Sequence, residues 1–201
     1  TPGIIFSGTV MPDFGPGQAS EKNWKVSGNT SGTRDVYTDT HNLIPTSYRY
    51  LLETVYSSNI PKKGVTDLCS GGSGSANCTL NPALPNGVYK IDGNLTFSDI
   101  GANYTFPPDK DFVILVDGDL TINRRLLVPI GSTVIFSVSG DIIVHPIVGG
   151  GASNAGSSLE GLYSADRNFI ANGKNNCDAG TDLRLNIAGT VVANAGRAGG
   201  T

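Results

Sequence analysis

The sequence predicts an all-β fold, namely a right-handed parallel β-helix with about 22–25 residues per coil. Three observations lead to this prediction: a recurring glycine phrase, strand-like segments on both sides of it, and a composition rich in glycine but poor in charge. Glycine accounts for 27 of the 201 residues, and only 15% of the residues are charged. This composition is typical of short strands joined by many tight corners.

The glycine phrase consists of an apolar residue, a small or acidic residue, glycine, then Asn, Asp or Thr, and an aliphatic residue. Its glycines are 25, 22 and 49 residues apart, and 49 is about two periods. We therefore place residues 159–162 in the missing interval as a degenerate copy, and expect each coil to turn at the same corner glycine. The corner glycines are Gly93, Gly118, Gly140, Gly161 and Gly189.

The chain divides into three segments of one continuous domain. Residues 1–65 hold N-terminal strands, among them phrase-like copies at 6–10 and 26–30, and one short amphipathic helix. Residues 66–86 form a loop bounded by cysteines, and residues 87–201 form the solenoid coils. Because the chain stops soon after the last phrase, we expect it to be a fragment of a longer protein.

The amphipathic helix is predicted from apolar residues at helical spacing after Pro45. We expect this helix to cover one end of the solenoid, since solenoid ends expose apolar surface and unpaired strand edges. The apolar residues are Tyr48, Leu51, Leu52, Val55 and Tyr56.

An antiparallel sandwich is the alternative architecture, because it also has short strands at intervals of 8–12 residues. A sandwich gives no reason for one phrase to return at a fixed period, so the solenoid is the preferred hypothesis.

Cys69 and Cys78 bound a Gly/Ser-rich spacer that is flexible enough to let them form a disulfide. Such a bond would contribute about 2–3 kcal/mol by loop-entropy arithmetic, and would indicate a secreted or cell-surface protein. Cys177 has no evident partner. A zinc site is not expected, because no closely spaced cysteine pair occurs and His41 and His145 are remote in sequence.

The net charge of −3 gives no general attraction to nucleic acids, and no apolar run is long enough to span a membrane. The sequence therefore predicts neither a nucleic-acid partner nor a membrane span in this chain.

Aspartates beside the corner glycines form a candidate carboxylate row. Paired carboxylates can act as acid and base, and clustered carboxylates can bind Ca²⁺. The alternative is that Asp and Asn favour corners simply because their side chains bond the local backbone. Ser139 interrupts the row at the third coil, and we assign no catalytic residue, metal site or cofactor. The row consists of Asp92, Asp117, Asp119 and Asp141.

The segments around the corner glycines resemble a family of uncharacterised exported β-solenoid proteins of candidate-phylum bacteria. The resemblance lies in Gly-Val-Tyr at 87–89, Val-Asp-Gly-Asp-Leu-Thr-Ile at 116–122 and Ser-Gly-Asp-Ile-Ile-Val at 139–144, and continues through 159–166 and 187–193. It implies a surface location and no established activity. The glycine phrase alone also resembles bactofilin-type polymerising solenoids, more weakly.

Three functional hypotheses follow. The leading one is a non-catalytic structural or adhesive module of a cell surface, with residues 66–86 and 146–158 as contact elements. The second is a carbohydrate-active enzyme or carbohydrate-binding module, and the third is a self-assembling filament subunit. Surface glycans and other copies of the chain are the corresponding partners.

Overall fold

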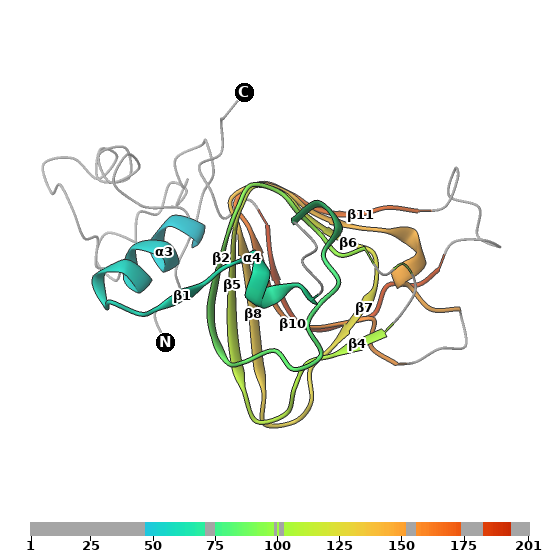
Figure 1. Ribbon diagram of the computed structural model, residues 1–201. Helices are drawn as coiled ribbons and strands as arrows, with labels where there is room; N and C mark the ends of the chain where they lie inside the picture. The colour runs from blue at the N-terminus through green and yellow to red at the C-terminus, as the bar shows by residue number, and fades with distance from the viewer. Residues whose placement is uncertain are drawn as a thin grey trace, which may run out of the picture.

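A computed structural model describes residues 47–70, 75–98, 100, 103–151, 156–173 and 183–193. These residues form a parallel β-solenoid of about four coils, which confirms the predicted architecture (Figure 1). All ladders between its strands are parallel. The phrase-like copies at 6–10 and 26–30 lie outside the described residues, as does Cys177, for which the sequence offers no evident partner.

The first face of the solenoid is a sheet with one strand from each successive coil. Strand order follows the chain, and register is continuous from coil to coil. Tyr89 pairs with Ile114, Ile114 with Phe136, and Phe136 with Tyr163. The strands are β1 (Lys62–Lys63), β2 (Gly87–Asp92), β5 (Asp111–Asp117), β8 (Thr133–Val138), β10 (Leu159–Ala165) and β12 (Ile187–Val192).

The second face is a four-stranded sheet formed by the segments that follow the first-face strands. Its strands are β3 (Leu95–Thr96), β6 (Leu120–Ile122), β9 (Ile142–Val144) and β11 (Phe169–Ala171).

The third face is shorter and contains β4 (Asn103–Thr105), β7 (Arg125–Leu127) and the beginning of β10. Strand β10 starts on the third face, where Leu159 pairs with Leu126. It ends on the first face, where Leu162 pairs with Ile135. The chain therefore turns a corner within β10 itself.

The core fills the space between the three faces with inward side chains at every second strand position. Val134, Phe136 and Val138 point inward and are buried, as their alternation predicts. Aromatic rings from neighbouring coils stack inside: the Phe136 and Tyr163 rings lie 5.2 Å apart and nearly parallel.

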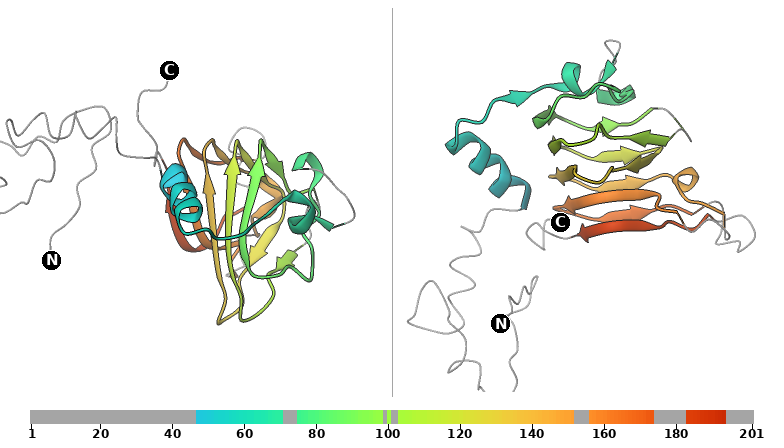
Figure 2. Two further views of the ribbon diagram at one scale, coloured as in Figure 1. Left: turned by 60° about the vertical axis from the view of Figure 1, so that its left-hand side comes forward. Right: turned by 90° about the horizontal axis from the view of Figure 1, so that it is seen from below.

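Helix α3 (Ser47–Ser57) is confirmed as a helix, but the prediction that it covers a solenoid end is wrong. It lies against the outer surface of the first face and runs along the stack (Figure 2). Tyr48 and Val55 pack there with Val88 and Leu115, so that Leu115 is fully buried although it points away from the core. The reason is that the first face carries a second apolar row on its outer side, which the helix must cover.

The described part of the segment predicted as a loop at 66–86 caps the first coil. Residues 65–70 and 75–86 contain α4 (Val65–Leu68) and the short 3₁₀ helix η2 (Ser75–Asn77), and the predicted disulfide between Cys69 and Cys78 is present. Both cysteines are buried in the core cluster together with Leu68 and Leu84, and Cys78 pairs with Phe97 of the first coil. The apolar residues flanking the Gly/Ser spacer thus close this end of the solenoid.

Candidate functional site

The corner between the first and second faces contains three of the predicted glycines in one column. The backbone N–H of Gly93 donates to the carbonyl of Asp117 at 3.0 Å, and that of Gly140 donates to the carbonyl of Gly118 at 2.9 Å. The prediction that Gly93, Gly118 and Gly140 stack in register is confirmed.

Gly161 and Gly189 lie at a different corner, where the third face meets the first. They are paired with each other in the ladder between β10 and β12, with positive φ angles of 112° and 151°. The prediction that all five glycines share one corner is therefore wrong. Residues 159–162 resemble the phrase, but they lie where β10 passes from the third face to the first. They therefore precede the first-face part of the strand, whereas the phrases at 93, 118 and 140 follow a first-face strand.

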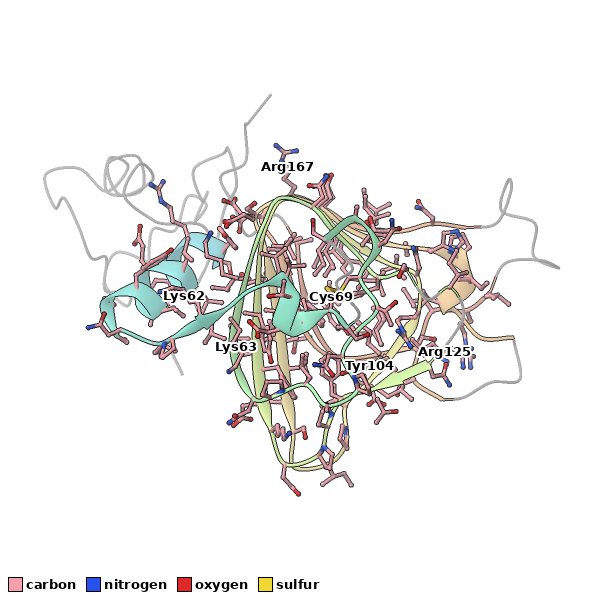
Figure 3. All side chains as sticks on the ribbon, viewed as in Figure 1. Lys62, Lys63, Cys69, Tyr104, Arg125 and Arg167 are labelled. Atoms are coloured by element: carbon pink, nitrogen blue, oxygen red, sulfur yellow. A yellow bond between two sulfur atoms is a disulfide. The ribbon has the colours of Figure 1, made fainter. Side chains whose placement is uncertain are left out.

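The fourth member of the first column is Arg167, whose N–H donates to the carbonyl of Gly140 at 3.2 Å. Its side chain points away from the coil (Figure 3). The real fourth copy of the phrase is Ala165-Asp166-Arg167-Asn168-Phe169, which the sequence analysis missed because arginine stands in the glycine position. The acidic residue, the asparagine and the two flanking apolar positions were the available signal.

Asn and Asp side chains one position after this column form a ladder that joins the coils. Asn94 Oδ1 accepts the N–H of Asp119 at 2.8 Å, and Asp119 Oδ1 accepts that of Asp141 at 2.9 Å. Asp141 Oδ1 accepts both the N–H and the side-chain Nδ2–H of Asn168, each at 2.9 Å. We call Asn94, Asp119, Asp141 and Asn168 the Asx ladder.

The Asx ladder explains two of the glycines. A Cβ atom at Gly118 would lie 2.5 Å from Asn94 Oδ1, and one at Gly140 would overlap Asp119 Oδ1 and lie 2.7 Å from the carbonyl oxygen of Gly118. Neither glycine has a positive φ, whereas Gly93 has a φ of 87° and free space around it. Close approach, and not backbone conformation, requires glycine at 118 and 140.

The candidate carboxylate row is split between two columns. Asp92 and Asp117 are register partners on the first face, and Ser139 follows them with its hydroxyl donating to Asp117 Oδ1 at 3.2 Å. Asp119 and Asp141 belong to the Asx ladder, where each accepts a backbone N–H from the next coil. The backbone-bonding hypothesis thus describes the ladder, with the difference that each bond reaches the next coil and not the local turn.

The carboxylates at this corner raise the pKa values of two neighbouring side chains, Lys90 and Tyr48. Lys90 forms an ion pair with Asp92, and this hydrogen bond raises the pKa of Lys90. Burial, reinforced by Asp117 and Asp92, raises the pKa of Tyr48 to about 12. The N–H of Tyr48 also donates to Asp166 Oδ1 at 3.3 Å, so the corner carboxylates anchor the start of α3.

Within the described ranges, no group of three or more His, Cys, Asp or Glu side chains is placed to hold a metal ion. His145 is exposed, and its Nδ1 accepts the N–H of Ile147, which caps the 3₁₀ helix η3 (Pro146–Val148). A shallow hollow of about 160 Å³ lies beside it and is lined by residues including Val144, Asn172 and Leu185.

Arg124 and Arg125 could form an anion site, but in the structure both guanidinium groups donate to backbone carbonyls. Arg124 is buried, lies 5.3 Å from the Tyr104 ring centroid and donates to the carbonyl of Asn103. Arg125 donates to the carbonyls of Val148 and Gly149 at 3.1 and 2.7 Å (Figure 3). The first part of the 146–158 insert, predicted as a contact element, is thereby tied to the third face.

No described helix packs on the outer surface of the second face, since α3 lies on the first. Its central column alternates with buried core residues and is partly exposed: Thr96, Thr121, Ile143 and Ile170. The Asx ladder borders it on one side. Asn123, His145 and Asn172 follow the strand ends on the other side. We call these three columns the second-face surface.

No helix in the described part of the chain is long and apolar enough to cross a membrane. The chain matches no family model, no curated protein and no solved structure.

Proposed function

We propose that the chain is a non-catalytic adhesive module of a secreted or cell-surface protein, and that its second-face surface binds a surface glycan. The observation that carries this proposal is the open second-face surface itself. Its columns repeat polar and aliphatic side chains once per coil, at about 4.8 Å, on strands that parallel ladders join from coil to coil.

The chemistry of the surface suits sugars. Hydroxyl, amide and carboxyl groups of Thr121, Asn172 and Asp141 can exchange hydrogen bonds with sugar hydroxyls, while Ile143 and Ile170 offer apolar contact to the C–H faces of a ring. A preformed surface loses little conformational entropy on binding.

Two observations support export and a non-catalytic role. The Cys69–Cys78 disulfide is typical of oxidising compartments. The carboxylates of Asp119 and Asp141 hold backbone N–H groups of the next coil, which favours a structural role over acid–base chemistry.

A glycan array, followed by titration against the best ligand, tests the proposal. Thr121→Arg and Ile143→Arg place a bulky charge in the central column and should weaken binding at least tenfold. Thr105→Arg on β4 is the matched control, since Thr105 is exposed and lies on the third face. Binding that survives both central substitutions, or no glycan bound at all, would refute the proposal.

Catalysis is tested separately. Incubation with acidic polysaccharides should release no reducing or unsaturated ends, and Asp117→Ala and Asp119→Ala should change nothing in that assay. Release of such ends, abolished by either substitution, would establish an enzyme instead.

A further inference from the structure

The shallow hollow beside His145 lies where the second face ends, at the carboxyl ends of β9 and β11. We call it the His145 hollow, because His145 lines it together with Val144 and Asn172. Its volume is about 160 Å³. Sites that enclose a whole small molecule usually measure at least about 300 Å³, so this hollow suits one substituent of a larger ligand.

Hydrogen bonds fix the walls of the His145 hollow. Val144 and Ala171, which line it, are register partners at the ends of their strands. The wall formed by η3 is held by Arg125, which donates to two of the backbone carbonyls there. The wall formed by residues 183–185 is held by two backbone bonds between Arg184 and Gly150, at 2.8 and 2.9 Å. The hollow is therefore preformed, and a ligand does not have to order it.

Gly149 lets residues 183–185 approach η3 closely enough to form the hollow. A Cβ atom at Gly149 would lie 2.6 Å from Leu183 Cβ and 2.9 Å from the Leu183 carbonyl oxygen. Because no side chain stands there, Leu183 and Leu185 reach the lining of the hollow. Leu183 is 36% exposed, so it offers aliphatic surface to a ligand.

His145 and Asn172 are the polar side chains of the lining. Both are exposed, and they follow the register partners Val144 and Ala171, so they lie about 4.8 Å apart along the stack. His145 Nδ1 accepts the N–H of Ile147, so the neutral ring carries its hydrogen on Nε2, where it can donate to a ligand. The Asn172 amide oxygen can accept. The pair can therefore match one acceptor and one donor on the same substituent.

The lining discriminates between the substituents that sugars carry. Among the residues that line the hollow there is no lysine or arginine, so a carboxylate or sulfate would lose hydration without gaining a cation. A hydroxyl group would leave the aliphatic side chains of Val144 and Leu185 without an apolar partner. An acetamido group matches the whole lining. Its methyl contacts the aliphatic side chains, its carbonyl accepts the His145 Nε2–H, and its N–H donates to Asn172 Oδ1.

We propose that the His145 hollow takes the 2-acetamido group of an N-acetylated amino sugar. This inference rests on the proposed function, since His145 and Asn172 also form part of the third column of the second-face surface. The glycan lies along that surface and places one acetamido group in the hollow. The second-face surface is therefore selective for glycans that contain N-acetylated amino sugars.

Three tetrasaccharides with one β-1,4 backbone test this selectivity in titrations of the full chain. Chitotetraose carries 2-acetamido groups, its de-N-acetylated form carries amines, and cellotetraose carries hydroxyls. Chitotetraose should bind at least tenfold more tightly than the other two, because only its substituent fills the hollow and pairs with both polar side chains. Equal affinity for chitotetraose and cellotetraose would overturn this inference.

The glycan array separates this inference from the proposed function. The glycans that bind should contain N-acetylated amino sugars, and chemical de-N-acetylation should weaken each of them. Binding only of glycans without such sugars would overturn the acetamido assignment and leave the glycan proposal standing. Binding of no glycan would refute both.

Substitutions in the lining locate the acetamido group. Ala171→Leu fills the hollow and should lower the affinity for chitotetraose at least tenfold without changing that for cellotetraose. Ala83→Leu is the matched control, since Ala83 is also exposed but lies in the segment that caps the first coil. Unchanged chitotetraose affinity in Ala171→Leu would overturn the proposal.

His145→Ser tests the hydrogen bond without filling the hollow. Serine can still cap η3, but it lacks the imidazole Nε2–H, so we expect a loss of about fivefold in chitotetraose affinity. Thermal melts of both lining variants check that the fold is kept. An equal loss for chitotetraose and cellotetraose would show that His145 does not contact the acetamido group, and would overturn the proposal.

Discussion

The glycines at the two corners of the solenoid are required for different physical reasons. At the corner of Gly93, Gly118 and Gly140, the Asx ladder brings a side-chain oxygen into the place where two of the glycines would carry a Cβ. At the corner of Gly161 and Gly189, the backbone itself turns with positive φ in the middle of a continuous ladder. Similar sequence phrases thus conceal a packing requirement at Gly118 and Gly140, a conformational requirement at Gly93, and both requirements together at Gly161 and Gly189.

The largest effect is expected at Gly161, where both requirements coincide. Its φ is 112°, and a Cβ would lie 2.7 Å from the carbonyl oxygen of Val134. Gly161→Ala should lower the free energy of unfolding by about 3–4 kcal/mol, since left-handed strain and overpacking add. Urea denaturation with an unchanged m-value measures it. A loss below that of Gly140→Ala would mean that the β10 corner relaxes.

Gly140→Ala violates the packing requirement alone and should lower the free energy of unfolding by about 2 kcal/mol. The overlap with Asp119 Oδ1 supplies a second test, because Asp119→Ala removes that atom. The double substitution should therefore be less destabilising than the sum of the two single ones. Additive losses would show that the ladder oxygen is not what excludes a side chain there.

Gly93→Ala violates the conformational requirement alone, since nothing lies within 4 Å of the Cβ position at residue 93. We expect a loss of about 1 kcal/mol, and a smaller one for Gly93→Asn, because Asn tolerates the left-handed region. Thermal melts of both variants compare the two. Gly64→Ala, with open space and a φ of −98°, is the control and should be silent.

The smallest effects concern the aspartates. Asp119→Ala breaks a 2.9 Å bond to the next coil and should cost about 1 kcal/mol, whereas Asp117→Ala should cost less than about 0.5 kcal/mol. Unfolding midpoints measured at the same pH provide the comparison. Equal losses would remove the distinction between the Asx ladder and its neighbouring column.

Much of the fold could be predicted, because solenoid coils repeat and repetition is visible in sequence. The period gave the parallel coils and the column of Gly93, Gly118 and Gly140, and the helical spacing of residues 48–56 predicted α3. The fourth phrase was missed because Arg167 replaces the glycine, and Gly161 was misplaced because phrase similarity does not record which face precedes it.

The surroundings of α3 and of the cysteines were harder to predict. The unbroken apolar run Phe112 to Val116 indicates a strand buried on both faces, and this was the signal that a helix covers the first face. The role of the disulfide segment depends on Leu68, Leu80 and Leu84, whose irregular spacing shows no period. The second-face surface is a product of register, since Thr121, Ile143 and Ile170 are about a coil apart in sequence.

Helix α3 changes how the solenoid unfolds. Its 11 residues extend about 16 Å, close to the three coil spacings, about 14 Å, that separate the first coil from the fourth. Solenoids usually unfold coil by coil, since each repeat contacts only its neighbours. Here Ser47 and Tyr48 are bonded to residues 117 and 118 positions away. The helix thus spans the stack from the first coil to the fourth. The fourth coil cannot fray without breaking the bonds to Ser47 and Tyr48, and during synthesis the docking of α3 is complete only once the fourth coil has formed.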